Sequence, residues 1–326
     1  MIFRKIISKA LVRVLLFLGV ALLSIVIFSC SEQEQSNAVV LADVPMLEDS
    51  RWVVVPVTIN SQDYRFFVDT ASGSTGVDIK LKSLLGDFIK KQEGTITPEK
   101  IPFEYETYKI PKRFKLGSLS MAGEIDCYDL SKGPLPPSHN YHGVIGMNCL
   151  QGKVLQFDLE NKRVRLLRWR KGASPSVDIL MQKWGHSIPM ITNELGYPQI
   201  HLNLTDTITE LFAVDTGLDS HNYLRESTFD KLIELDGVEY HGKEDVQAKA
   251  RSQGIEFKPE ELREIVLINQ ISLSGIDLTN QHFSRRRRSI LGIRFVRVFR
   301  MMTFDFENNI LYLKPPVADS SGNKTP

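Results

Sequence analysis

Two short motifs place an Asp at the end of an apolar run, and they constrain the fold of this chain more than any other feature. The first reads Phe-Phe-Val-Asp-Thr-Ala-Ser-Gly over residues 66–73, and the second reads Leu-Phe-Ala-Val-Asp-Thr-Gly over residues 211–217. Short apolar runs bounded by turn residues are typical of buried strands. An ionised carboxylate in an apolar setting is costly unless it is paired or hydrogen-bonded. Two such strands predict that Asp69 and Asp215 meet.

The intervals that follow the two Asp residues are equal. Gly146 ends a Val-Ile-Gly motif 77 residues after Asp69 (146 − 69), and Gly292 ends an Ile-Leu-Gly motif 77 residues after Asp215 (292 − 215). A Phe-Asp-x-Glu-Asn segment then follows in each half, at 157–161 and 304–308. A repeat this long indicates two domain-sized lobes rather than a solenoid.

These residues resemble the aspartic proteases, whose signature is Asp-Thr-Gly with a later apolar-apolar-Gly in each lobe. In detail the chain is similar to bacterial retropepsin-like members, fused as two lobes in the pepsin manner, and the resemblance covers Arg51 to Pro315. It implies an all-β, bilobal pepsin-like fold, in which two related β-barrel-like lobes surround a central cleft. It also implies an aspartic-type endopeptidase that acts on a peptide or protein substrate.

The resemblance assigns the catalytic roles to Asp69 and Asp215. Two carboxylates about 3 Å apart share one proton and titrate as a pair. One of them activates a water and the other hydrogen-bonds the scissile carbonyl, so the reaction needs no metal and no organic cofactor. Because one chain supplies both carboxylates, we expect a monomer. Supporting roles are expected for the remaining residues of the motifs: Thr70, Ala71, Ser72, Thr216, Gly217, Gly146 and Gly292.

The two halves of the site are not identical. The two Thr residues are expected to hydrogen-bond across the lobe interface, and Gly146 and Gly292 to lie beneath the catalytic loops. Ala71 stands where the second motif has Gly217, and the Ser72 hydroxyl is expected to bond the outer oxygen of Asp69, whereas Leu218 has no such group. These departures leave a rival open, a non-catalytic peptide-binding relative. A weaker third option is an envelope scaffold.

Candidate substrate-binding residues lie in two regions. A flap hairpin is expected between residues 91 and 110, where Tyr105 and Tyr108 are candidates for its tip or wall, or else core residues. The second region is the run Arg285, Arg286, Arg287 and Arg288. A run of like charges is usually a solvated loop. Its place before Ile290 also suggests selection of acidic side chains in a peptide, and contact with anionic lipid is a further option.

The N-terminus predicts export. Four basic residues precede an apolar run of 15 residues at 14–28, which is shorter than the roughly 20 residues of a transmembrane helix. This pattern favours a secretory signal. Cys30 ends a sequence that resembles a bacterial lipobox, so lipidation of Cys30 is expected, with an uncleaved signal anchor as the alternative. Both place the folded part outside the cytoplasm, on a membrane of the bacterial envelope facing periplasm or exterior, and Ser31 suggests the outer membrane.

The composition of the chain limits the functions that it can have. The 326 residues include 40 basic and 39 acidic residues, which gives no sign of nucleic-acid binding. Cys127 and Cys149 could pair in an oxidising compartment, or serve as buried thiols. The expected divisions are a signal peptide or anchor at 1–30, a flexible tether at 31–50, a first lobe at 51–168, a connector at 169–185, a second lobe at 186–315 and a disordered tail at 316–326.

Overall fold

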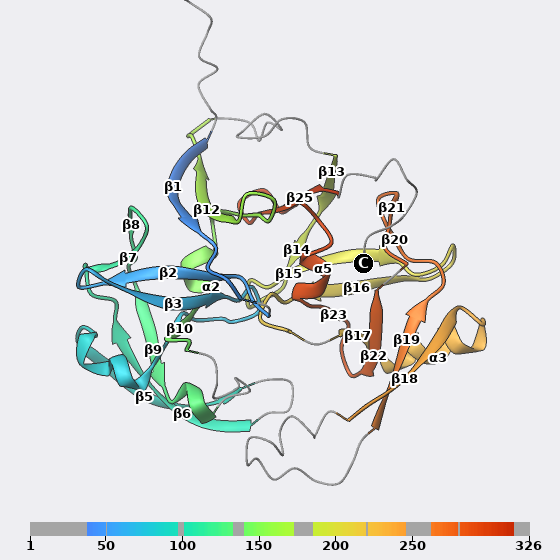
Figure 1. Ribbon diagram of the computed structural model, residues 1–326, viewed down its shortest axis with the longest axis horizontal. Helices are drawn as coiled ribbons and strands as arrows, with labels where there is room; N and C mark the ends of the chain where they lie inside the picture. The colour runs from blue at the N-terminus through green and yellow to red at the C-terminus, as the bar shows by residue number, and fades with distance from the viewer. Residues whose placement is uncertain are drawn as a thin grey trace, which may run out of the picture.

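The computed structural model describes residues 38–49, 51–96, 101–132, 140–172, 185–219, 221–245, 262–279 and 281–315 (Figure 1). The signal segment with Cys30, and the tail expected at 316–326, lie outside these residues. Within the described residues, no helix has the length and apolar character needed to cross a membrane.

The first lobe is built on one sheet. Val55, Val57 and Ile59 of strand β2 (Val54–Ile59) are fully buried, as the alternation of apolar residues in this segment predicts. The strand order is β5 (Phe88–Ile96), β6 (Ile101–Lys109), β9 (Glu124–Tyr128), β4 (Gly76–Asp78), β10 (Gly143–Ile145), β3 (Gln62–Val68), β2 (Val54–Ile59), β7 (Phe114–Leu116) and β8 (Leu119–Ser120).

The second lobe repeats this order position by position. Its strands are β18 (Val238–Asp245), β19 (Leu262–Ile268), β22 (His282–Arg286), β17 (Asn222–Arg225), β23 (Ile290–Leu291), β16 (Thr209–Val214), β15 (Pro198–Asn203), β20 (Ser272–Leu273) and β21 (Ile276–Asp277), with β14 (Ile191–Thr192) paired to β15. The all-β fold of two related lobes is confirmed, because the sequence repeat corresponds to a repeat of sheet topology.

A third sheet joins the lobes (Figure 1). Its order is β1 (Ala38–Pro45), β12 (Arg163–Trp169), β11 (Val154–Asp158), β24 (Met301–Asp305), β25 (Ile310–Lys314) and β13 (His186–Pro189). β11 from the first half pairs with β24 from the second, and the two Phe-Asp segments of the repeat therefore lie side by side. The connector expected at 169–185 starts at the last residue of β12 and ends just before β13.

The tether prediction for residues 31–50 is wrong over residues 38–45. This segment forms β1, which pairs with β12 along its length, and buries Ala38, Ala42 and Val44. The polar composition of residues 31–37 extended the prediction too far, because the alternating small and branched apolar residues that follow are sufficient for an edge strand.

Helices are short and few among the described residues. They are α2 (Met147–Leu150), α3 (Glu226–Glu234) and α5 (Ile293–Val296), with 3-10 turns η1 (Ile79–Leu84) and η2 (Leu130–Lys132). α2 and α5 follow Gly146 and Gly292 respectively, so they are further members of the repeat.

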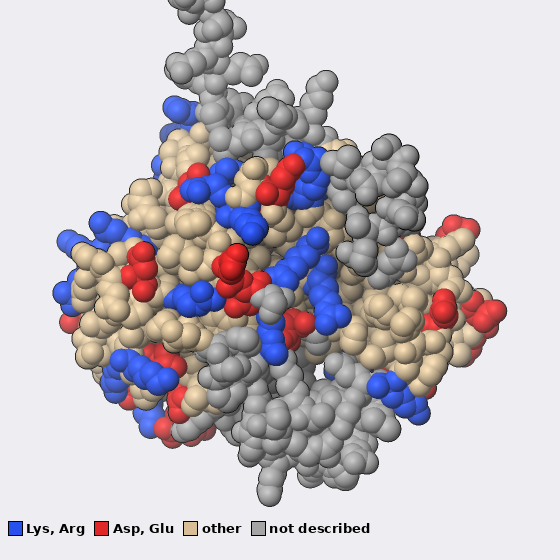
Figure 2. Space-filling model, viewed as in Figure 1, with Lys and Arg blue, Asp and Glu red and all other residues tan. Residues whose placement is uncertain are grey.

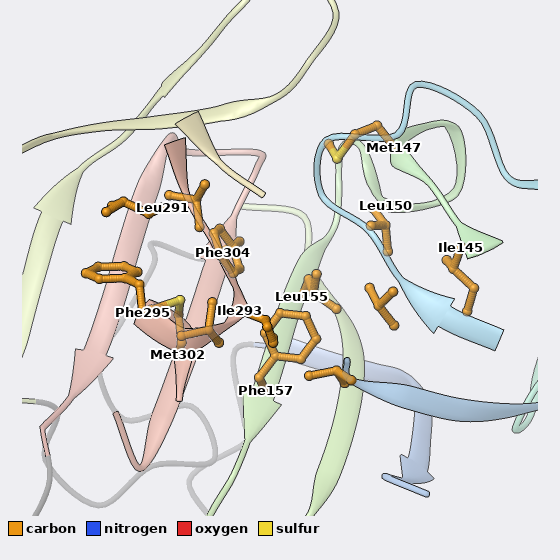
Figure 3. Close-up of a cluster of buried hydrophobic side chains, with 14 of the residues drawn as sticks. Ile145, Met147, Leu150, Leu155, Phe157, Leu291, Ile293, Phe295, Met302 and Phe304 are labelled. Carbon is orange, nitrogen blue, oxygen red and sulfur yellow. The ribbon is translucent and has the colours of Figure 1, made fainter. Parts of the chain in front are cut away.

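The hydrophobic core is continuous through both lobes. Figure 3 shows Ile145, Met147 and Leu150 of the first lobe and Leu291, Ile293 and Phe295 of the second on either side of the paired strands β11 and β24. Phe157 and Phe304 meet there edge to face, with ring centroids 6.0 Å apart. Packing on both sides of this sheet fixes the lobes relative to each other and hence the loops between them.

The surface carries charges of both signs, with Lys and Arg side chains gathered near the centre of the face in Figure 2. Cys127 and Cys149 are separate buried thiols. Burial raises the pKa of Cys127 to about 11, which keeps this thiol protonated and unreactive at neutral pH.

Candidate active site

Asp69 and Asp215 follow equivalent strands and are held by equivalent bonds. Asp69 comes directly after β3 and its N–H donates to the Ile145 carbonyl at 3.0 Å. Asp215 comes directly after β16 and its N–H donates to the Leu291 carbonyl at 2.8 Å. The loops after both strands therefore start from fixed, buried positions.

The two carboxyl groups meet, as the sequence predicts. A side-chain hydrogen bond joins Asp69 and Asp215. The Ala71 N–H donates to Asp69 Oδ1 at 2.8 Å, and the Gly217 N–H donates to Asp215 Oδ1 at 2.9 Å. Each carboxyl group is thus oriented by the backbone two residues later, and Ala71 serves in this role as well as Gly217 does.

The environment favours retention of a proton on this pair. Burial raises the pKa of both carboxyl groups, and the charge of Asp69 raises the pKa of Asp215 further, well above its ordinary value. The hydrogen bond between the two carboxyls lowers the pKa of Asp69 and raises that of Asp215. The two carboxyl groups therefore hold one proton between them and titrate as a coupled pair.

Thr70 and Thr216 lock the two loops together across the lobe interface. The Thr70 N–H donates to Thr216 Oγ1 at 3.1 Å, and the Thr216 N–H donates to Thr70 Oγ1 at 3.2 Å. Each hydroxyl donates in turn to the partner lobe, Thr70 to the Val214 carbonyl at 2.6 Å and Thr216 to the Val68 carbonyl at 2.7 Å. Both Thr side chains are fully buried, so these four bonds are shielded from water.

Gly146 and Gly292 lie against the catalytic loops, where a side chain has no room. A Cβ on Gly146 would lie 2.2 Å from the Ser74 carbonyl oxygen, and one on Gly292 would lie 2.7 Å from the Leu218 carbonyl oxygen. The following residues bond the same loops, Met147 N–H to Ser72 O at 2.7 Å and Ile293 N–H to Leu218 O at 2.9 Å. The matched spacing of the two glycines in the sequence thus corresponds to matched support.

The role predicted for the Ser72 hydroxyl is wrong. Ser72 Oγ donates to the Ser74 carbonyl at 2.8 Å, whereas the backbone N–H of Ser72 donates to the Asp69 carbonyl at 3.4 Å. The backbone N–H of Leu218 makes the equivalent bond to the Asp215 carbonyl at 3.2 Å. The two halves of the pair are therefore more alike than their side chains indicate, because the backbone makes the contact in both.

The candidate flap residues have different positions. β5 and β6 form a hairpin in the region expected for a flap. Tyr108 is buried in the core, edge to face with Phe88 at 5.7 Å, and its hydroxyl bonds Glu106. Tyr108 is thus a core residue, one of the two options open for it. Tyr105 is half-buried and donates to Gln92 Oε1 at 3.1 Å across the hairpin.

The four arginines do not form one solvated loop. Arg285 and Arg286 are part of β22, whereas Arg287 and Arg288 are exposed. Arg285 pairs with Asp230 of α3 at 2.9 Å and lies over the Phe229 ring. Arg286 is buried and lies over the Tyr223 ring. The run therefore combines residues with separate roles, because alternate positions of a strand face opposite sides of its sheet.

Two residues that the sequence analysis did not single out lie at the site. The Trp52 indole N–H donates to the Gly217 carbonyl at 2.7 Å, across the lobes. The Tyr197 hydroxyl bonds the Gly73 backbone, and burial followed by the charges of Asp69 and Asp215 raises its pKa. Both residues lie outside the Asp motifs. In the sequence, Tyr197 is marked only by its place next to Gly196. An aromatic residue beside a glycine is not a specific signal for an active site.

The comparisons with known proteins give no family assignment. No protein-family model matches the chain, and no curated protein matches it. Among solved structures, the crystal structure of Basic 7S globulin from soybean is similar, with a TM-score of 0.49 and 11% sequence identity, over 88% of this chain and 97% of that chain. Support for a function therefore comes from the geometry of this chain alone. Among the described residues, no group of three or more His, Cys, Asp or Glu side chains is arranged to hold a metal ion.

Proposed function

We propose that this chain is an aspartic-type endopeptidase that hydrolyses peptide bonds with Asp69 and Asp215. The observation that carries the proposal is the pair of hydrogen-bonded carboxyl groups with raised pKa values, held between two lobes by reciprocal Thr bonds. A pair that holds one proton supplies an acid and a base at one place, which is what addition of water to an amide requires.

In the proposed mechanism, the ionised member of the pair takes a proton from a water while the water oxygen attacks the scissile carbonyl carbon. The protonated member hydrogen-bonds the carbonyl oxygen, which gains charge as the tetrahedral intermediate forms. A proton then passes from the pair to the amide nitrogen, the C–N bond breaks, and the products are a carboxylic acid and an amine. No covalent enzyme intermediate forms.

The fixed loops are as important as the carboxyl groups in this proposal. Proximity accelerates a reaction only when the reacting groups keep a near-attack geometry. The Thr70–Thr216 bonds tie the loops to each other, and the bond from Trp52 to Gly217 ties the second loop to the first lobe. Because one chain supplies both loops, the proposed active form is a monomer.

The rival is a protein that binds peptides without cleaving them. A digest of a degenerate peptide library, with products identified by mass spectrometry, separates the two. The soluble form for this test starts at residue 31, because a start at Arg51 would remove β1 from the joining sheet. Cleavage that a statine-type transition-state mimic inhibits supports the enzyme. Binding without cleavage supports the rival.

We further propose that the chain is lipidated at Cys30 and tethered to a membrane of the bacterial envelope. The basic and apolar N-terminus and the lipobox-like sequence support this proposal. Labelled palmitate fed to cells that express the full chain tests it. Wild type is expected to incorporate the label and Cys30→Ala to remain unlabelled. Equal label in both, or none in wild type, contradicts lipidation at this residue.

A further inference from the structure

Arg286 is a buried cation whose charge no described residue neutralises. Its side chain is 7% exposed, and neither Nε nor Nη1 has a hydrogen-bond partner. Its guanidinium carbon lies 4.5 Å from the centroid of the Tyr223 ring, which is the contact that holds it. A buried cation without hydrogen bonds is costly. A partner for these atoms is therefore to be sought beyond the described residues.

A second unsatisfied group lies on the same face of the strand. Ser284 is fully buried, and its Oγ also lacks a hydrogen-bond partner among the described residues. Ser284 and Arg286 are two positions apart on β22 and so project from one face. Phe283, which precedes Ser284, projects into the core on the other face. Arg286 Nε and Nη1 and Ser284 Oγ are therefore buried, unsatisfied groups on the same face of β22.

The repeat between the lobes shows where this group lies relative to the carboxyl pair. In the first lobe, Asp78 of β4 stands beside Tyr128 of β9. In the second lobe, Arg225 of β17 stands beside Arg286 of β22, at the equivalent register. Arg286 thus occupies the place that Tyr128 has in the first lobe, and Ser284 the place of Asp126.

The position of Tyr128 borders the candidate active site. Its ring lies over Gly76, because a Cβ on Gly76 would be 2.7 Å from the Tyr128 hydroxyl. After burial, the charge of Asp69 is the largest cause that raises the pKa of Tyr128. The pseudo-twofold relationship gives Arg286 the position relative to Asp215 that Tyr128 has relative to Asp69.

The two lobes differ in how the polar side chains of this region are hydrogen-bonded. Asp126 accepts from Ser74 Oγ at 2.5 Å and from Thr107 Oγ1 at 2.8 Å, so the first lobe completes its own network. The equivalent Ser284 and its neighbour Arg286 have no such bonds. Among the described residues, the unsatisfied donors at this place are in the second lobe only. Such an asymmetry is suited to a ligand that binds in one orientation.

We propose that Arg286 and Ser284 bind a carboxylate of the peptide substrate, namely an Asp or Glu side chain close to the scissile bond. This inference rests on the proposed peptidase function and names its substrate class. Guanidinium N–H groups and a hydroxyl are all donors to a carboxylate, and charge-assisted bonds of this kind are strong. The Tyr223 ring beneath the guanidinium keeps it in place for the incoming acid.

The test measures cleavage of a peptide library blocked by acetyl and amide groups at its ends. The best acidic sequence is then compared with its Gln or Asn counterpart. Wild type is expected to favour the acid by about 10- to 100-fold in kcat/KM, as a charged hydrogen-bond pair predicts. Arg286→Gln is expected to lose most of this ratio. Arg287→Gln, which removes an exposed charge beside it, is expected to keep the ratio.

Ser284→Ala provides a second, smaller change. It should lower the acid-to-amide ratio several-fold, and it supplies the test if Arg286→Gln does not fold by circular dichroism. A repeat with free C-termini distinguishes the sources of the carboxylate. A preference that appears only with free C-termini indicates a terminal carboxylate and overturns the side-chain proposal. An unchanged ratio in both folded variants also overturns it.

If the proposed peptidase function is wrong, the outcome differs from that of a missing carboxylate site. If wild type cleaves no peptide, binding of the acidic and amide peptides is measured by calorimetry. Tighter binding of the acid that Ser284→Ala weakens would support the carboxylate site in a non-catalytic protein. Equal binding of acid and amide peptides would overturn the carboxylate site together with the peptidase.

Discussion

Trp52 of the first lobe donates its indole N–H to the carbonyl oxygen of Gly217 in the second, at 2.7 Å. Around this bond, Arg51 pairs with Asp219 at 3.3 Å, and Arg297 donates to the Asp49 carbonyl at 3.1 Å. Trp52 also packs against Phe67, two residues before Asp69, with ring centroids 5.5 Å apart. One side chain thus contacts the approaches to both carboxyl groups, and it couples lobe packing to their alignment.

Trp52→Phe should lower stability and activity together. The variant keeps an aromatic ring against Phe67 but leaves the Gly217 carbonyl without its donor, which costs about 1–3 kcal/mol. Thermal unfolding by circular dichroism and kcat/KM on a library-derived peptide measure the two effects. Tyr64→Phe, a half-buried aromatic away from the pair, provides the control. Unchanged stability and activity in Trp52→Phe would contradict the coupling.

The bonds between Thr70 and Thr216 make a second prediction. Thr216→Val keeps the shape but removes the hydroxyl, so the Thr70 N–H and the Val68 carbonyl lose a partner. We expect a loss of about 1–3 kcal/mol in the free energy of unfolding for each group left unpaired, and reduced cleavage. Thr216→Ser restores the hydroxyl and should recover most of both. Urea unfolding measures the difference, and a Val variant as stable as the Ser variant would refute the lock.

Gly217 makes a prediction about the pair itself. A Cβ at this position would lie 2.4 Å from Asp69 Oδ2. Gly217→Ala should therefore displace the carboxylate and lower kcat about 100-fold, the effect of a misplacement of about 1 Å. The equivalent change in the first lobe, Ala71→Gly, removes a methyl group and should cost much less. Equal losses in the two variants would indicate that the two loops are not arranged as described.

The raised pKa of Asp215 makes stability depend on pH. Its folded pKa lies well above the ordinary 3.8 because of burial and the charge of Asp69. A group with a raised folded pKa stabilises the protein below its unfolded pKa, and this contribution is lost as the pH rises through the folded pKa. Asp215→Asn cannot ionise. Its melting temperature should therefore rise relative to wild type as the pH increases from acidic to neutral, and a constant difference would contradict the shift.

Much of the site could be predicted from the sequence, because a repeat of Asp, Thr and Gly at equal spacing reports on topology. The Asp69–Asp215 contact, the Thr bonds and the glycine supports all follow from that repeat. Strand β1 was missed because an edge strand needs only a few small apolar residues. The Ser72 hydroxyl was misassigned because a sequence does not show which of two acceptors a hydroxyl chooses. Trp52 depends on a contact between distant strands, which local patterns do not encode, and the sequence marked Arg286 only as one of four adjacent arginines.

The most direct test of the account is cleavage of a peptide library by Asp69→Asn and by Asp215→Asn, each compared with wild type. Both variants keep the volume of the side chain, so a folded protein by circular dichroism is expected for each. The account predicts that wild type cleaves peptides and that either substitution abolishes cleavage, because a single carboxyl cannot serve as both acid and base. Cleavage by wild type that persists in either folded variant would contradict the shared-proton mechanism.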